Sequence, residues 1–325
     1  MNRKNQILAG FLALQVVLVA VIFWPRPVAA PPGGGSLFPG LDASKISALT
    51  IRDADGQQVG LARGQDGWVL PQADDYPCLA TRVQPLLDKL VSLKADRLVT
   101  QTRASHKQLK VGDEDYQRQI EYELADGTRH KLYLGVAAGY QATHVRAEGS
   151  DDVYLASGLS VADAPAQPSG WVDTLYISVP QDQLVALMVE NANGTLEFER
   201  DDAGVWTMRG LATNETADEE SISAFASQVT SVNMLQPLGK TEQESYGLKT
   251  PGAAVTAKAR SQDGTVKSYT YRVGAQASQD NSYVVISSES PYYVRVAGFA
   301  VEDLLRKRHS DLLQLPETPT PAQSQ

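Results

Sequence analysis

The chain has 325 residues, 42% hydrophobic and 21% charged, so it is long enough for about two globular domains with separate cores. Its formal net charge of −9 disfavours nucleic acid or an anionic membrane surface as the main partner, because both need a basic face. The single cysteine, Cys78, excludes an internal disulfide and any metal site built from several cysteines.

The first predicted element is an almost continuous apolar run over residues 7–24. At about 1.5 Å per residue, a helix of this length reaches roughly 27 Å, close to the hydrocarbon thickness of a bilayer. Arg3 and Lys4 precede the run, so the positive-inside rule predicts a cytoplasmic N-terminus and an extracytoplasmic remainder. We therefore expect a signal-anchor over residues 1–24, crossing the cytoplasmic (inner) membrane once. The alternative is a cleaved signal peptide, since residues 28–30 resemble a cleavage site, although the apolar run exceeds a typical signal-peptide core.

Residues 25–44 are rich in proline and glycine, including the run Gly33-Gly34-Gly35, and are predicted to form a tether. The C-terminal residues 317–325 follow Pro316 and show no hydrophobic periodicity, so we expect a disordered tail there.

Between the tether and the tail the sequence contains an internal repeat. Trp68 recurs as Trp206, an offset of 138 residues (206 − 68). Three further matches keep nearly this offset: Asp55-Gly56 with Asn193-Gly194, Asp126-Gly127 with Asp263-Gly264, and Gly135 with Gly274. We therefore predict two tandem copies of one domain, over residues 45–180 and 181–316.

Each copy is predicted to contain hairpin strands and one long helix. Asp-Gly and Asn-Gly pairs favour two-residue hairpin turns, because both central positions need positive φ. In the first copy the helix is expected where apolar residues recur at helical spacing from Val83 to Leu93. The strands are expected at residues 46–53, 58–63, 68–70, 97–101, 116–124, 130–134, 143–147 and 153–156. Hairpins are many and helical crossovers few, so the predicted class is α+β with a mainly antiparallel sheet in each copy.

Two helices are predicted in the second copy. The first covers residues 222–232, with Thr216 or Asp218 as its N-cap. The second runs without interruption over residues 299–309. The segment 171–180 between the copies is short and apolar, so we expect the two domains to pack on one another there.

The order of motifs in the second copy resembles a bacterial membrane-anchored family known as domain of unknown function 4340. The motifs are Trp206, the helical stretch 222–232, Tyr246-Gly247-Leu248, the segment from Asp263-Gly264 to Gly274, and Asp303-Leu304-Leu305-Arg306. The first copy has residues 105–109 where the Tyr-Gly-Leu motif would fall. Members of that family tend to accompany ABC-type transporters of the kind tied to gliding motility, and they have no established catalytic residues. The resemblance therefore implies an extracytoplasmic accessory or binding role and supplies no site residue.

A search for chemistry in the sequence yields no catalytic, cofactor-binding or metal-binding residues. There is no Gly-x-Ser-x-Gly nucleophile elbow. The four histidines, His106, His130, His144 and His309, form no His-x-x-x-His pair. We expect a protein that is not an enzyme and needs no cofactor, with a hydrolase site built from dispersed loops as a further alternative.

One feature of the second copy has no counterpart in the first, namely a group of tyrosines on its last predicted strands: Tyr269, Tyr271, Tyr283, Tyr292 and Tyr293. Tyrosine offers flat amphipathic area at low entropic cost, which suits protein or glycan contacts. We predict a partner-contacting surface, distal to the membrane, around Tyr283, Tyr292 and Tyr293. The alternative is that these tyrosines pack at a sheet edge as ordinary strand residues.

These observations leave one leading function and one alternative. The leading prediction is a single-pass, membrane-anchored accessory protein that interacts with a membrane complex such as an ABC-type transporter. The alternative is an extracytoplasmic module that binds a glycan or peptide in a cleft between the two copies.

Overall fold

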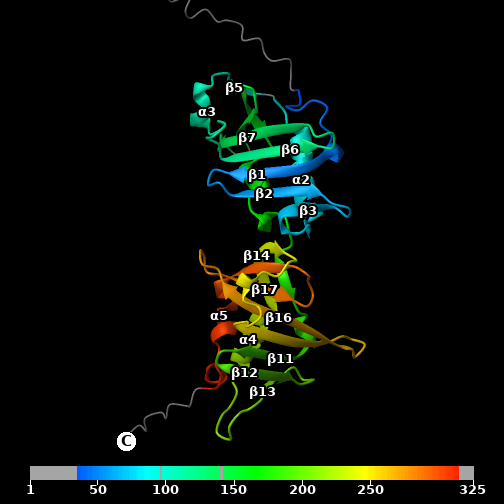
Figure 1. Cartoon of the computed structure of the whole chain (residues 1–325), viewed down its shortest axis with the longest axis vertical. Coiled ribbons are helices and arrows are strands. Elements are labelled where there is room, and N and C mark those ends of the chain that lie inside the picture. Colours follow the sequence, from blue (N-terminus) through cyan, green and yellow to red (C-terminus); the bar gives the residue numbers. More distant parts are fainter. Residues whose placement is uncertain (1–34, 96, 140–141, 315–325) are drawn as a thin grey trace, which may run out of the picture.

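The computed structural model describes residues 35–95, 97–139 and 142–314. They form two nine-stranded sheets that lie one beyond the other along the long axis of the molecule (Figure 1). Every strand pairing is antiparallel. Helices are few, so the predicted α+β class with antiparallel sheets is confirmed. We call residues 35–174 the first half and residues 175–314 the second half.

The first sheet has the strand order β4-β3-β2-β1-β6-β7-β8-β9-β5. Its strands are β1 (Ile46–Asp53), β2 (Gln58–Arg63), β3 (Trp68–Leu70), β4 (Tyr76–Pro77), β5 (Arg97–Thr100), β6 (Arg118–Leu124), β7 (Arg129–Ala137), β8 (Ala142–Ala147) and β9 (Val153–Ser157). The first half also holds helices α2 (Ala80–Ser92) and α3 (Ala104–Leu109), and the 3-10 turns η1 (Ala43–Lys45), η2 (Pro71–Ala73), η3 (Val161–Asp163) and η4 (Pro168–Gly170).

The second sheet has the strand order β10-β14-β18-β17-β16-β15-β11-β12-β13. Its strands are β10 (Leu175–Ser178), β11 (Leu184–Asn191), β12 (Gly194–Arg200), β13 (Trp206–Met208), β14 (Ser231–Gly239), β15 (Ala253–Arg260), β16 (Val266–Gln276), β17 (Ser282–Ser287) and β18 (Tyr293–Ala297). The second half also holds helices α4 (Glu219–Val229) and α5 (Gly298–Arg306), and the 3-10 turns η5 (Gln181–Gln183), η6 (Glu244–Tyr246) and η7 (His309–Leu312).

Read from opposite ends, the two sheets share an order of eight strands, with β4 added to the first sheet and β10 added to the second. The likeness extends to irregularities. The pairing of β1 with β6 shifts register between Ile46 and Ala48, and the pairing of β11 with β15 shifts between Leu184 and Ala186. A bulge inserts one unpaired residue and bends a strand at a defined point, so its recurrence indicates the same sheet geometry in both halves.

The two tryptophans that the repeat aligns occupy equivalent positions in the two sheets. Trp68 begins β3 and is 7% exposed, while Trp206 begins β13 and is 6% exposed. A guanidinium covers each indole ring, from Arg63 at 5.2 Å and from Arg200 at 5.8 Å. Each ring therefore closes the end of its core under a cation.

The long helices bury the faces that their spacing predicts. On α2 the buried residues are Val83, Leu86, Leu87 and Leu90, and on α4 they are Ile222, Phe225, Ala226 and Val229. The side chain of Asp218 accepts a hydrogen bond from the Ser221 amide, so Asp218 rather than Thr216 is the N-cap of α4. Helix α4 ends at Val229, and the expected continuation to residue 232 is wrong because the chain enters β14 at Ser231.

The terminal helix is shorter than predicted. It covers Gly298–Arg306, and a separate 3-10 turn follows at His309–Leu312, so an unbroken helix over residues 299–309 is wrong. Side chains of the β11–β12 turn cap its C-terminal carbonyls. The Asn191 amide donates to Leu304 O at 2.9 Å, and the Asn193 amide donates to Arg306 O at 2.8 Å. Because carbonyls at a helix end need partners, these contacts from another element stop the helix there.

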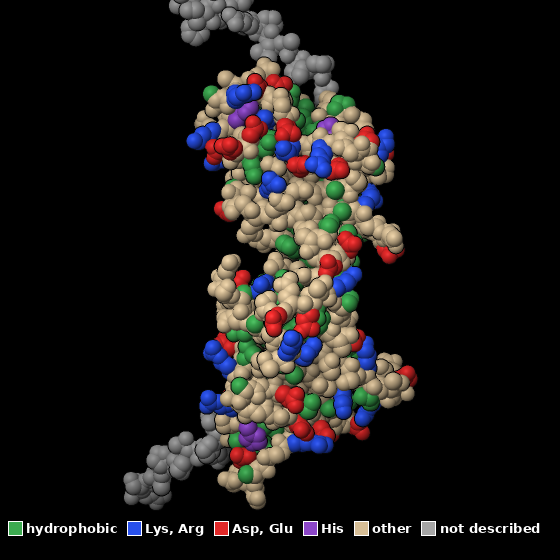
Figure 2. Space-filling view, in the orientation of Figure 1, with side chains coloured by type: hydrophobic (Ala, Val, Ile, Leu, Met, Phe, Trp, Pro, Cys, Tyr) green, Lys and Arg blue, Asp and Glu red, His purple; other side chains and the backbone are tan. Residues whose placement is uncertain are grey.

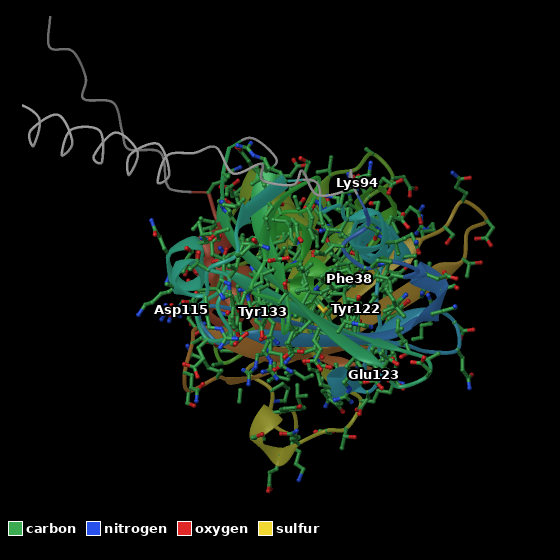
Figure 3. All side chains as sticks on the ribbon, turned by 90° about the horizontal axis from the view of Figure 1, so that it is seen from above. Phe38, Lys94, Asp115, Tyr122, Glu123 and Tyr133 are labelled. Atoms are coloured by element: carbon green, nitrogen blue, oxygen red, sulfur yellow. The ribbon has the colours of Figure 1, made fainter. Side chains whose placement is uncertain are left out.

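The folded part of the chain begins before the boundary predicted at residue 45. Leu37 N donates to Leu93 O at 2.7 Å, and the rings of Phe38 and Tyr122 meet edge to face at 5.3 Å (Figure 3). Residues 35–44 of the expected tether are thus packed on the first half. The predicted anchor over residues 1–24 and the predicted tail over 317–325 lie outside the described residues. Within those residues, no helix has the length and apolarity to cross a membrane.

The segment between the sheets is divided between the halves. The Leu79 amide donates to Trp171 O, and the Trp171 indole donates to Pro165 O, so Trp171 closes the first half. Strand β10 instead pairs with β14 in the second sheet, although a boundary at residue 180 places it with the first copy. The chain therefore passes from one half to the other at residues 172–174.

The two halves differ at one turn, where the first half has a strained residue. Gly135 and Gly274 match in position, and an added Cβ would lie 2.0 Å from Leu109 O or 2.1 Å from Tyr246 O. The residue after each carbonyl is left-handed, namely Gly247 with φ +66° in the second half but Lys110 with φ +56° in the first. The first half therefore keeps this turn with a lysine in a conformation that favours glycine.

We expect Lys110→Gly to stabilise the protein by about 1 kcal/mol, because relief of the left-handed strain outweighs the added freedom of the unfolded chain. The lysine also pairs with Asp115 at 3.1 Å, but an exposed pair contributes little. Chemical denaturation of the variant checks this value. The reciprocal control is Gly247→Ala, which should destabilise because it adds strain and places a Cβ 3.0 Å from that of Ala275. Equal stability of Lys110→Gly and wild type would contradict this explanation.

Candidate functional site

One segment of the first half, residues 74–76, bonds directly to the second half. The carboxylate of Asp74 accepts a hydrogen bond from the backbone N–H of Lys240 at 2.6 Å. The preceding Gly239 has φ +101°, and an added Cβ would lie 2.5 Å from Asp74 Oδ2. Only glycine leaves room for this carboxylate to reach the amide, so positions 74 and 239 fit one another. We call the contact of residues 74–76 with residues 239, 240 and 292 the joint.

Tyr292 forms the other side of the joint. Its hydroxyl donates to Asp75 O at 3.1 Å, and its ring meets that of Tyr76 edge to face at 4.7 Å. The Lys240 ammonium lies 4.8 Å from the ring centroid. Burial, followed by the charge of Asp173, raises the pKa of Tyr76. Hydrogen bonds and aromatic contacts thus converge on the segment 74–76.

A buried tyrosine of β10 supports this arrangement from within the second half. The Tyr176 hydroxyl donates to Tyr292 O at 2.6 Å and accepts from Ser287 N at 3.0 Å. Burial raises the pKa of Tyr176 to about 12, so the hydroxyl stays protonated and keeps its donor at neutral pH. Strand β10 therefore fixes the position of Tyr292, which in turn contacts the first half.

The segment 74–76 is itself strained. Asp74 and Asp75 are both left-handed, with φ of 51° and 61°. Such a backbone costs of the order of 1–3 kcal/mol per residue, although aspartate tolerates it better than most side chains. Strain of this size persists only where surrounding contacts determine the conformation. Here they include the β3–β4 pairing of the first half and the bonds of Asp74 and Asp75 to the second half.

Beside the joint lies a cleft of about 640 Å³, within the range of small-ligand sites. Figure 2 shows the molecule hollowed at its waist, between the two halves. The first half contributes Gln57, Gln58, Leu70, Gln72, Ala73, Ala166, Gln167, Pro168 and Ser169, and the second contributes Leu235, Gln236, Pro237, Leu238, Asp280 and Arg295. Both halves are therefore needed to form this cleft, which we call the waist cleft.

The lining of the waist cleft is polar but nearly uncharged. Five of its residues are glutamines, and its two charged residues, Asp280 and Arg295, have opposite signs. The amides of Gln57 and Gln167 bond to one another at 2.8 Å along one wall. Leu235 is 46% exposed there, which leaves apolar surface available to a ligand. The arrangement offers neutral hydrogen-bond donors and acceptors beside apolar patches.

The three tyrosines predicted as a partner surface do not lie together. Tyr292 is held at the joint, facing the first half. Tyr283 packs against the main core, whereas Tyr293 packs in a smaller cluster with Val284 on the opposite face of the sheet. Of the other two tyrosines in the group, Tyr271 is buried and donates to Val229 O, and Tyr269 lies beneath the Lys267 ammonium. None of these tyrosines lines the waist cleft.

The four histidines make separate local contacts. His106 Nε2 lies 3.0 Å from Asp151 O, His144 Nδ1 lies 2.7 Å from Val136 O, His309 Nε2 lies 3.0 Å from Glu215 Oε2, and His130 stacks on Tyr122. Across residues 35–95, 97–139 and 142–314, no three histidine, cysteine, aspartate or glutamate side chains are grouped so that they could hold a metal ion.

A comparison with protein families gives one match. The model described as Domain of unknown function (DUF4340) matches residues 68–251, more than half of the chain. The matched segment includes both Asp74 and Gly239, so it spans the joint between the halves. Neither the curated proteins nor the solved structures contain a match to this chain.

We expect Asp74→Gly to loosen the joint without unfolding either half. Glycine accepts the left-handed backbone at position 74, but the Lys240 amide loses its acceptor. Loss of a hydrogen bond to a charged group costs about 1.5–3 kcal/mol, so exchange of the Lys240 amide with solvent deuterium should accelerate at least about tenfold.

The matched control is Asp75→Gly, which makes the same backbone change but removes no side-chain bond across the joint. It should leave the exchange of the Lys240 amide close to that of wild type. Equal protection of that amide in all three proteins would show that the Asp74 contact does not hold the halves together.

Proposed function

Because this chain belongs to the DUF4340 family, whose description names no activity, we propose its function from the structure itself. The protein is a membrane-tethered, non-enzymatic binding protein that holds its ligand in the waist cleft. The observation that carries the proposal is the cleft itself, which both halves line beside the joint. Contacts between domains commonly build such sites, because neither domain alone encloses the ligand.

The chemistry of the cleft favours binding over catalysis. Its titratable residues are Asp280 and Arg295, and no histidine, cysteine or tyrosine lines it. A nucleophile with an adjacent base is the arrangement that acyl or glycosyl transfer needs. A set of neutral amides instead provides orientation and specificity for a bound molecule.

The membrane part of the proposal comes from the sequence. If residues 1–24 cross the bilayer, ten residues, 25–34, separate them from residues 35–44, which pack on the first half. Ten residues span at most about 36 Å, so the first half would stand close to the membrane surface. The family resemblance implies that the partner is a membrane complex such as an ABC-type transporter, and the waist cleft would then face that complex from outside the cytoplasm.

Site-specific photocrosslinking in cells tests this function. A photoreactive residue at Gln58, an exposed residue of the cleft, should yield a covalent adduct in the membrane fraction. Gln101, an exposed glutamine of the same half outside the cleft, is the matched control and should yield none. Adducts at Gln101 but not at Gln58 would overturn the assignment of the cleft. Recovery of the full chain outside the membrane fraction would contradict the proposed attachment to the membrane.

A further inference from the structure

The waist cleft selects its ligand first by charge. Asp280 and Arg295 balance one another, and the remaining polar lining consists of five glutamines and Ser169. A lining with no net charge attracts neither a strongly anionic nor a strongly cationic ligand, and either would lose part of its hydration there. The ligand that fits is therefore uncharged.

The glutamine amides favour a ligand that contains peptide groups. Each amide presents one acceptor oxygen and two donor hydrogens. It can therefore accept from the N–H of a peptide group and donate to its C=O. One of these amides, that of Gln72, is placed to do this within the protein itself. With the amide turned over so that its oxygen faces Gly60 N, Gln72 would accept from Gly60 N at 2.9 Å and donate to Gly60 O at 3.2 Å. A lining glutamine can thus bind a main chain through both of its polar atoms.

An incomplete strand edge adds main-chain groups to the cleft. Strand β10 pairs with β14 only at residues 231–233, and Met234 N donates to Thr174 O at the end of that ladder. Beyond this point β14 pairs with β18 on its other side, and residues 235–238 line the cleft. Pro237, in the middle of this stretch, has no N–H to donate. Peptides commonly bind along the edges of strands.

The apolar lining distinguishes between two neutral ligands. Sugar rings and peptides can both bond to amides, but sugar rings typically stack on flat aromatic faces. The described lining of the waist cleft contains no aromatic residue, and its apolar surface comes from leucine, proline and alanine. Leu235 in particular exposes nearly half of its side chain. Aliphatic patches of this kind suit the side chains of a peptide.

We propose that the waist cleft binds a short, extended, uncharged peptide segment, with glutamine amides on its main chain and Leu235 against one of its side chains. This inference rests on the function proposed above, because it names the ligand class of the same cleft. The peptide segment would belong to a partner protein outside the cytoplasm.

The test uses the full chain in lipid nanodiscs. Immobilised protein is offered a pool of acetylated, amidated heptapeptides that contain only alanine, leucine, valine, proline, threonine, asparagine and glutamine. Chitohexaose and maltoheptaose are offered separately as glycan probes. Retained peptides are identified by mass spectrometry, and the affinity of the tightest is measured by calorimetry.

Two variants locate the bound peptide. Leu235→Ser removes apolar contact in the cleft and should weaken binding at least about tenfold, as expected for an interface residue of moderate importance. Val266→Ser is the matched control, because Val266 is 48% exposed on β16 outside the cleft, and its affinity should equal that of wild type. Both variants must keep the wild-type melting temperature.

Each other outcome overturns the inference. If either glycan binds and no peptide is retained, the ligand class is wrong while the cleft remains a binding site. If a peptide binds equally to wild type and to Leu235→Ser, it binds elsewhere. If no probe is retained, the peptide assignment fails, and the crosslinking at Gln58 then decides separately whether the cleft binds any ligand.

Discussion

The fit of the Asp74 carboxylate against Gly239 and the Lys240 amide is the contact that links the joint to the waist cleft. It connects a turn of the first half to the end of β14 in the second, and Tyr292 fixes the adjoining residues 75 and 76. Strand β14 also supplies Leu235 to Leu238 as one wall of the waist cleft. The same strand therefore sets both the joint and the cleft, so a shift at one would alter the other.

The joint lies where two otherwise similar sheets differ. Each half repeats the same eight-strand order and closes its core with a tryptophan at the start of β3 or β13. Their added strands differ, because β4 extends the first sheet beside the joint and β10 extends the second. These two additions bring Tyr76 and Tyr176 to the boundary, where both act through Tyr292. Two of the features that distinguish the halves thus lie where they meet.

Local chemistry made most of the fold predictable from the sequence. Asp-Gly and Asn-Gly pairs mark the hairpins, and the apolar spacing from Val83 identifies α2. Predictions failed where distant residues decide the outcome. The side chain of Asn191, at the end of β11, caps a carbonyl of α5. Phe38 packs on Tyr122, although the residues around Phe38 have the composition of a linker. A cleft between the copies was expected as one alternative, but its lining could not be predicted, because its glutamines are scattered from position 57 to position 236 and follow no period. The tyrosines drew attention by their composition, but packing places Tyr292 at the joint.

The central claim is that the joint holds the two halves in one arrangement, so that the waist cleft exists before any ligand binds. Double electron–electron resonance measures this directly with spin labels at Asp55 and Ser278, exposed positions near the cleft in the first and second halves, in a Cys78→Ser background. One narrow distance is expected with the wild-type joint, and a broader distribution is expected when Asp74→Gly is added. A broad or bimodal distribution with the joint intact would contradict this claim.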